Sequence, residues 1–151
     1  MNGLTIEKTP AQAPETQAWL LRFSADWAGE NSCFGYRANT EADLEGETAY
    51  LARLDGTPVG YLFGHMTRQS QNTVAVPGGA ACFEVEELYV TPTCRSKGIG
   101  GALMRRLEED LRGAADYLTL STATKNWRSI FHFYIEELGM TFWNARLFKK
   151  L

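Results

Sequence analysis

The stretch that decides the fold runs from Phe83 to Leu111 and reads FEVEELYVTPTCRSKGIGGALMRRLEEDL. It predicts a strand that ends at Pro92, a tight turn, and an amphipathic helix with glycines at 98, 100 and 101 at its entrance. A helix N-terminus offers unpaired N–H groups and a partial positive charge, and glycines let an anion approach them. The pattern indicates a phosphate-binding turn, to which Arg95 and Lys97 add two charges. The alternative is an ordinary glycine-containing turn.

Two common phosphate loops do not fit this turn. A P-loop requires lysine and then Ser or Thr after its last glycine, but Ala102 follows Gly101. The dinucleotide fingerprint needs a glycine where Leu103 stands. What remains is the pattern [R/Q]-x-x-G-x-[G/A], which begins at Arg95. With the preceding Glu-Leu-Tyr-Val-Thr-Pro and a later tyrosine-bearing helix, residues of about 82–140 resemble the GNAT superfamily of acetyl-CoA-dependent N-acyltransferases.

The order of elements agrees with this resemblance. The expected fold is a single α/β domain over residues 1–151, with a mixed, mainly antiparallel sheet of six to seven strands flanked by about four helices. The expected strands are 4–8, 48–54, 59–67, 82–90, 117–123 and one or two closing strands within 141–149. The expected helices are 14–27, a short acidic one at 41–47, 99–111 and 126–138.

Composition narrows the class of protein. The 151 residues carry a net charge of −3 with 44% hydrophobic residues, which is typical of a globular protein and gives no basic field for nucleic acid. Three cysteines without metal-ligand spacing favour neither a disulfide framework nor a zinc site. No apolar run is long enough to span a membrane. We expect a cytoplasmic protein with no metal.

The resemblance implies acetyl-CoA as co-substrate. Its pyrophosphate would contact the turn formed by Arg95, Ser96, Lys97, Gly98, Ile99, Gly100 and Gly101. The resemblance also implies that the strand before the turn splays from its neighbour, so that backbone groups of Leu88, Tyr89 and Val90 face the pantetheine arm. Asn126 is either the N-cap of the later helix, which we favour, or a further contact to that arm.

Three glutamates in the same strand are candidates for the general base. Strict alternation places Glu84 and Glu86 on the face of Leu88 and Val90, and places Glu87 with Val85 and Tyr89. Carboxylates that are crowded and partly desolvated have raised pKa values, which suits a base near neutral pH. The resemblance favours Glu87 first and Glu86 second. The alternative is that these side chains face water or pair with an arginine.

Tyr134 is the candidate general acid. The family's helix carries a tyrosine about four residues before a Gly-[Phe/Met] pair, whereas Tyr134 precedes Gly139 by five. Either the helix contains an extra residue, such as a π-bulge, or the role of the tyrosine is displaced. Tyr134 also shares a helical stripe with apolar residues, which is typical of a core tyrosine.

These residues favour an N-acetyltransferase that moves acetyl from acetyl-CoA to a primary amine, of a small molecule or peptide, by direct attack in a ternary complex. The alternative is a CoA-binding regulatory domain with little or no catalysis. Candidates for the acceptor wall are the 68–80 loop and the aromatic residues Trp27, Phe34, Tyr36 and Tyr61, although most of these aromatics are more typical of the core. Acidic positions 41, 43, 45 and 47 either attract a cation or only solvate a surface helix. The apolar segment 141–148 suggests a terminal strand that either pairs with a second subunit, which would make a homodimer, or is covered within the chain.

Overall fold

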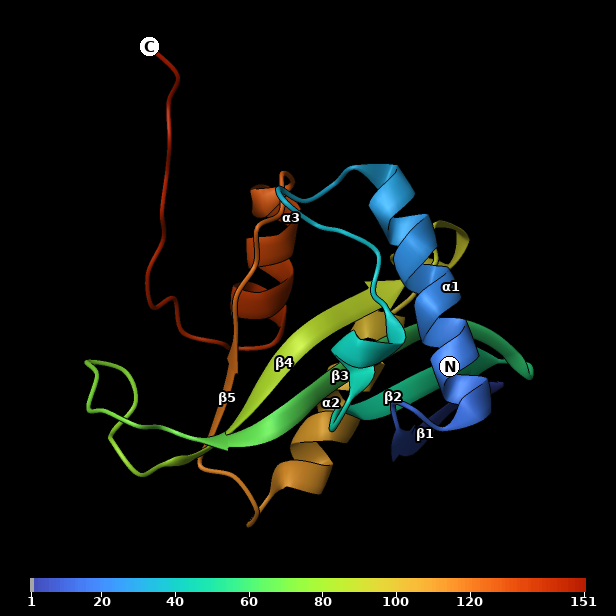
Figure 1. Cartoon of the computed structure of the whole chain (residues 1–151), viewed down its shortest axis with the longest axis horizontal. Coiled ribbons are helices and arrows are strands. Elements are labelled where there is room, and N and C mark those ends of the chain that lie inside the picture. Colours follow the sequence, from blue (N-terminus) through green and yellow to red (C-terminus); the bar gives the residue numbers. More distant parts are fainter. Residues whose placement is uncertain (1) are drawn as a thin grey trace.

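The computed structural model describes residues 2–151. Five strands form one sheet in the order β1-β2-β3-β4-β5, and these are β1 Leu4–Pro10, β2 Thr48–Leu54, β3 Thr57–Arg68, β4 Ala81–Val90 and β5 Tyr117–Leu120. The first four strands are antiparallel neighbours, and β5 runs parallel to β4. The mixed, mainly antiparallel sheet is therefore confirmed (Figure 1).

Three α-helices accompany the sheet: α1 Pro14–Glu30, α2 Ile99–Leu111 and α3 Trp127–Phe131, which continues as the π-helix His132–Glu137. Short 3-10 turns cover Glu41–Leu44 and Pro92–Cys94. Pro14 begins α1 because a proline in the first turn lacks only an N–H that the helix does not use. The acidic helix expected at 41–47 is this short 3-10 turn.

Local sequence explains the central hairpin. Leu54 pairs with Thr57, so the loop between β2 and β3 holds two residues. Asp55 and Gly56 both have positive φ, at 49° and 83°, which is the conformation of a type I′ turn and suits an Asp-Gly pair. The turn expected from the sequence is thus confirmed.

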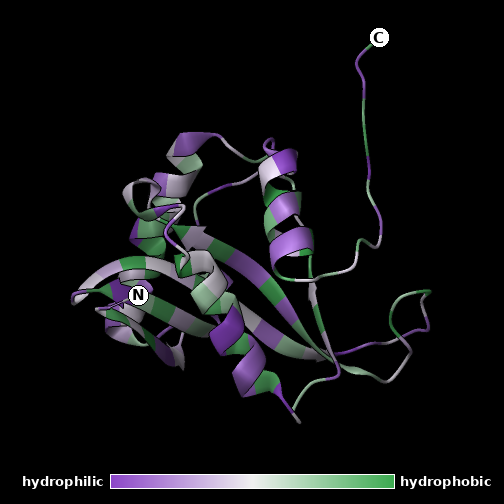
Figure 2. Cartoon of the chain, turned by 180° about the vertical axis from the view of Figure 1, so that it is seen from behind, coloured by the Kyte–Doolittle hydropathy of each residue, from purple (hydrophilic) through white to green (hydrophobic). Residues whose placement is uncertain are grey.

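Two apolar clusters hold the helices on opposite faces of the sheet. Leu20 and Phe23 of α1 pack against one face with Tyr61 and Tyr89. Leu103 and Leu107 of α2 pack against the other face, and Phe133, Tyr134 and Leu138 lie against the same cluster. Coloured by hydropathy, the chain shows hydrophilic and hydrophobic patches alternating along these helices (Figure 2). This packing leaves α1 alone on one face, opposite α2 and the π-helix.

The number of strands and helices is lower than expected. The structure has five strands and three helices rather than six to seven strands and about four helices. The closing strands expected within 141–149 are absent, since residues 141–151 form neither helix nor strand and lead away from the sheet (Figure 1). A strand needs the backbone of a neighbour, and within residues 2–151 this segment pairs with none.

Candidate functional site

A β-bulge in β4 organises the acidic residues. Phe63 pairs with Glu87 and Gly64 pairs with Val85, so Glu86 is an extra residue on β4. The bulge is built around Gly64, where any side chain would collide with the carbonyl oxygen of Glu84. An extra residue shifts the alternation of every side chain that follows it.

The face assignment made from strict alternation is therefore wrong beyond the bulge. Val85 belongs to the cluster under α2, and Leu88, three residues later, packs against that same cluster. Tyr89 belongs to the opposite cluster under α1. Val85 and Leu88 thus share a face, while Glu87 shares the α1 face with Tyr89.

Glu87 is the centre of a hydrogen-bond network on the α1 face. The hydroxyl groups of Tyr61 and Tyr36 donate to its Oε1 at 2.6 and 3.0 Å, and the Asn39 amide donates to both carboxylate oxygens at 2.9 Å. Burial raises the pKa of Glu87, and these three donors oppose that rise. Ser24 extends the network, because its Oγ lies 2.6 Å from the Tyr36 hydroxyl and accepts the Asn39 N–H at 2.7 Å.

Sequence reasoning identified only part of this network. Tyr36 and Tyr61, considered for the acceptor wall or the core, both donate to Glu87, and Tyr61 is fully buried in the cluster under α1. Asn39 and Ser24 were missed. Asn39 lies 48 residues from Glu87, and a single asparagine in an irregular segment carries no periodic signal.

Glu86 has a different environment from Glu87. Its side chain is 45% exposed, and its Oε1 lies 3.8 Å from Nδ1 of His65, whose ring also contacts the Glu47 carboxylate at 3.0 and 3.1 Å. Partial burial and then the neighbouring Glu47 raise the pKa of Glu86, whereas His65 opposes the shift. The exposed carboxylate with a raised pKa is chemically suited to accept a proton.

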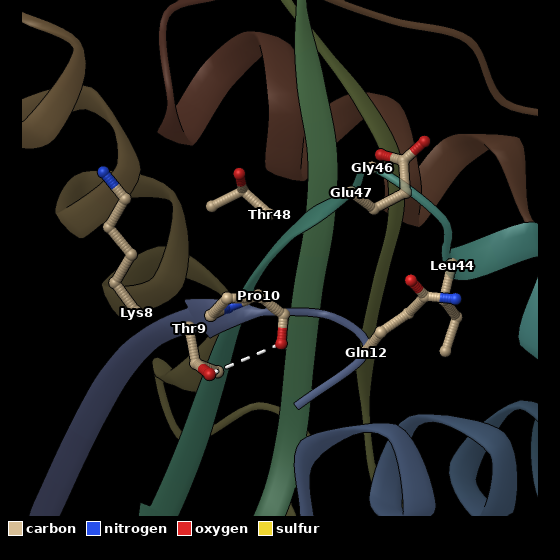
Figure 3. Close-up of a pocket in the computed structure, with 8 residues that line it drawn as sticks. All are labelled: Lys8, Thr9, Pro10, Gln12, Leu44, Gly46, Glu47 and Thr48. Atoms are coloured by element: carbon tan, nitrogen blue, oxygen red, sulfur yellow. Dashed lines mark hydrogen bonds between the residues drawn. The ribbon is translucent and has the colours of Figure 1, made fainter. Parts of the chain in front are cut away.

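Glu47 also borders a hollow of about 480 Å³ between the end of β1 and the start of β2 (Figure 3). The lining residues are Lys8, Thr9, Pro10, Gln12, Leu44, Gly46, Glu47 and Thr48. Of the acidic positions expected to attract a cation, Asp43 is already paired with the Arg37 guanidinium at 2.8 Å. Glu47 both lines this hollow and contacts His65, which in turn lies beside Glu86, so it links the hollow to the Glu86 side of the sheet.

The glycine turn has the backbone that an anion site requires. Gly98 is the N-cap of α2 with φ of 82°, and Ser96 also has a positive φ of 60°. Ile99 is buried in the core and anchors the helix start, while Gly98 beside it is exposed. A Cβ on Gly100 would lie 3.3 Å from the Phe133 ring of the π-helix. The helix start is thus close to the neighbouring wall because residue 100 lacks a side chain.

Arg95 is already engaged by the protein. Its guanidinium forms two bonds with the Glu30 carboxylate, at 2.7 and 2.9 Å, and its Nε donates to the Val90 carbonyl at 2.8 Å. The guanidinium also lies 5.4 Å from the centre of the Tyr89 ring. Arg95 therefore ties the end of α1 to the end of β4 beside the turn.

The expected splay of β4 is visible in the pairing. β5 pairs with β4 only from Cys82 to Val85, and Val85 opposite Leu120 is the last pair. Leu88, Tyr89 and Val90 lie beyond it, so no residue of β5 pairs with them, although the Val90 carbonyl is taken by Arg95.

The π-helix accounts for the position of Tyr134. The Leu138 N–H donates to the Phe133 carbonyl five residues earlier, so the helix contains the extra residue that the spacing predicted. Burial, followed by the neighbouring Cys33, raises the pKa of Tyr134 to about 12. Asn126 is at the N-cap position of α3, as favoured from the sequence, although its side chain makes no capping hydrogen bond.

Comparison with known families identifies the family of this chain. The model of the acetyltransferase (GNAT) family matches residues 13–140. The chain belongs to the GNAT acetyltransferase family. Acetyltransferases of this family take their acetyl group from acetyl-CoA, and the start of α2 offers the exposed backbone N–H groups with which a helix binds an anion. Among the residues that the structure describes, no group of three or more His, Cys, Asp or Glu side chains could hold a metal ion.

Solved GNAT acetyltransferases share this fold at low sequence identity. An aminoglycoside acetyltransferase, HMB0005, from an uncultured soil metagenomic sample is 16% identical with a TM-score of 0.71, covering 98% of both chains. Ribosomal-protein-alanine N-acetyltransferase from Brucella melitensis biovar Abortus 2308 is 18% identical with a TM-score of 0.66, covering 97% of this chain and 99% of its own. No curated protein matches. No helix within residues 2–151 combines the length and apolar character needed to cross a bilayer.

Proposed function

We propose that this chain is an N-acetyltransferase that moves the acetyl group of acetyl-CoA to a primary amine by direct attack in a ternary complex. The observation that carries the proposal is the position of Glu86. The bulge places this half-exposed carboxylate next to the stretch of β4 that is unpaired on its β5 side. An ammonium group cannot attack a thioester, so a base at this place is what the reaction requires.

The geometry separates the roles of the two glutamates. Resemblance placed Glu87 first, but its Oε1 already accepts three hydrogen bonds and its side chain is held by Tyr36, Tyr61 and Asn39. Glu86 carries no such set of donors and is open to solvent. We therefore assign proton removal to Glu86, and the ordering of the aromatic acceptor wall to Glu87.

Other residues of the site have complementary roles. The N–H groups at the start of α2, with Lys97 beside them, would hold the pyrophosphate, and the unpaired stretch Leu88–Val90 would orient the pantetheine arm. Tyr134 would protonate the departing thiolate, since its phenol carries a proton at neutral pH. Tyr134 lies on the π-helix and packs against the apolar cluster under α2.

The acceptor is proposed to be a cationic primary amine. The support is the acidic lining of the α1 side, where Glu47 and Glu86 flank His65. Solved relatives of this fold include an aminoglycoside acetyltransferase in complex with sisomicin and a ribosomal-protein-alanine N-acetyltransferase. These two acceptor classes, an aminoglycoside amine and a peptide N-terminus, are the first to try.

A thiol reagent that reports CoA release tests the function directly. The purified protein is given acetyl-CoA with an aminoglycoside, a peptide with N-terminal alanine or a lysine peptide, and Glu86→Gln serves as the matched variant. Amine-dependent CoA release that Glu86→Gln lowers supports the enzyme. Tight CoA binding with no release for any amine would favour the alternative, a CoA-binding regulatory domain. The shifted spacing of Tyr134 first suggested that alternative, and the π-helix now offers a structural account of the shift.

A further inference from the structure

The imidazole ring of His65 on β3 lies between two carboxylates. Its Nδ1 is 3.0 and 3.1 Å from the two oxygens of Glu47, and 3.8 Å from Oε1 of Glu86. One ring nitrogen therefore faces three carboxylate oxygens. The Glu47 side chain is only 12% exposed, so the charges of this group are screened by solvent less than those of a surface ion pair.

The contacts of this ring assign a hydrogen to Nδ1. Ionised carboxylates only accept hydrogen bonds, so a bare nitrogen facing them would repel them with its lone pair. Nδ1 therefore carries a hydrogen whether the ring is neutral or charged, an assignment made from the network. At 3.0 Å this N–H donates to Glu47, whereas 3.8 Å is too long for a hydrogen bond to Glu86. Glu86 thus lies beside a donor that does not occupy its lone pairs.

Glu86 depends on this neighbour because of the β-bulge. As the extra residue of β4, Glu86 has no partner on β3. Within residues 2–151, no basic group other than His65 lies within 4.0 Å of its carboxylate. The other charged groups that face Glu86 are acidic: Glu47 before β2, and Glu84 and Glu87 on β4 itself. Burial and then Glu47 raise the pKa of Glu86, and His65 opposes that rise.

We propose that His65 is a positioning residue for the base: held by Glu47, its ring keeps the carboxylate of Glu86 ionised and in place. The inference rests on the proposed function, in which Glu86 takes a proton from the acceptor ammonium. The freed amine then attacks the thioester carbonyl, the C–S bond breaks, and Glu86 returns its proton to solvent. His65 exchanges no proton with the substrate. Its N–H offsets the repulsion between Glu47 and Glu86, which would otherwise favour a protonated Glu86 that cannot act as a base.

The pH profile of kcat/KM in His65→Phe tests this role. Phenylalanine keeps a planar ring but removes the Nδ1 hydrogen, so Glu47 and Glu86 face each other without a donor between them. The acid limb of kcat/KM should move to higher pH by about one unit, the low end of what one nearby charge produces. Above that limb the variant should regain near wild-type activity, with CoA affinity unchanged throughout. His65→Asn retains an N–H donor the same number of bonds from Cα, so it should keep most of the wild-type profile.

Two further variants give a shift of the opposite sign and a matched control. Glu47→Gln removes the like charge and should move the acid limb to lower pH, and the double variant with His65→Phe should lie between the two single variants. His132→Phe is the control, because His132 also contacts two carboxylates, Glu136 at 3.0 Å and Glu137 at 3.3 Å, but on the π-helix. His132→Phe should leave the acid limb in place. Circular dichroism checks that each variant is folded.

Carboxyl ¹³C NMR of the glutamate-labelled protein adds a readout that needs no acceptor amine. The Glu86 signal is assigned by its loss in Glu86→Gln, and its titration should move to higher pH in His65→Phe and to lower pH in Glu47→Gln. A Glu86 titration that stays in place in folded His65→Phe would overturn the role of His65, as would a loss of rate that is equal at every pH. If Glu86→Gln itself keeps the acid limb, the assignment of the base fails instead, and the NMR titration still decides whether His65 acts on Glu86.

Discussion

Gly100→Val tests whether the absence of a side chain at the start of α2 serves cofactor binding. The structure places a Cβ at this residue 3.3 Å from Cζ and 3.7 Å from Cε1 of Phe133. Valine adds two further carbons, so the Phe133 ring must move, and overpacking of this kind costs about 1–3 kcal/mol. Valine has a higher helix propensity than glycine, which offsets only about 0.4 kcal/mol of this destabilisation. We expect net destabilisation of about 1–2 kcal/mol, which lowers Tm by roughly 2–8 °C.

We expect Gly100→Val to weaken the free energy of CoA binding by more than it lowers the free energy of unfolding. Losing charge-assisted contacts worth about 1.5–3 kcal/mol weakens binding by about 10- to 150-fold. Calorimetric titration with CoA measures this at a temperature where the variant is folded. Gly29→Val is the matched control, because a Cβ at this helical glycine meets no atom within 4 Å. A folded Gly100→Val with unchanged CoA affinity would refute the assignment of the turn.

Three further predictions concern the rest of the site. Arg95→Ala should weaken CoA binding by about 1.5–3 kcal/mol. Glu30→Gln releases the Arg95 guanidinium from its carboxylate partner, so calorimetry should show CoA affinity equal to or tighter than wild type. Weaker CoA binding by Glu30→Gln would contradict this interpretation. Tyr134→Phe should lower kcat by about 10²-fold or more with little change in CoA affinity. Because the pKa of Tyr134 is about 12, loss of its proton should not lower the wild-type kcat up to about pH 10. Tyr61→Phe removes the shortest hydrogen bond to Glu87 and should raise the pKa of that carboxyl further. When the pKa of Glu87 is raised in the folded state, the folded protein binds the proton more tightly than the unfolded protein does. Lowering the pH from 7 to 5 should therefore raise the free energy of unfolding in urea by more in Tyr61→Phe than in wild type.

The sequence predicted most elements for identifiable reasons. The Asp55-Gly56 pair suits a two-residue hairpin, and the apolar stripe through Leu103 and Leu107 predicts the buried face of α2; the structure confirms both. The count of residues before Gly139 raised the possibility of an inserted residue in the last helix, which the π-helix confirms. Each of these signals is local, because it depends on residues within a few positions of one another.

The features that the sequence did not predict depend on contacts between distant segments. The bulge at Glu86 exists because Gly64 on β3 allows close approach, and no pattern within β4 itself reveals it. One donor on Glu87 is Tyr61 of the neighbouring strand β3, while Tyr36 and Asn39 reach it only when the loop after α1 folds over the sheet. The prediction of a strand within 141–149 was wrong for a related reason. Alternation of apolar and polar residues shows that a segment can pair as a strand, but not that a partner strand is present.

The pH dependence of kcat/KM in Glu86→Gln is the most direct test of the proposed base. Burial and Glu47 raise the pKa of Glu86, so wild-type activity should fall as the pH drops through that raised value, because only the carboxylate can accept a proton. We predict that Glu86→Gln lowers kcat/KM by about 10²–10⁴ and abolishes this acid limb, with CoA affinity and Tm near wild type. Glu87→Gln, measured in parallel, should keep the limb. Near-normal turnover with the limb intact in folded Glu86→Gln, or loss of the limb in Glu87→Gln instead, would contradict the account.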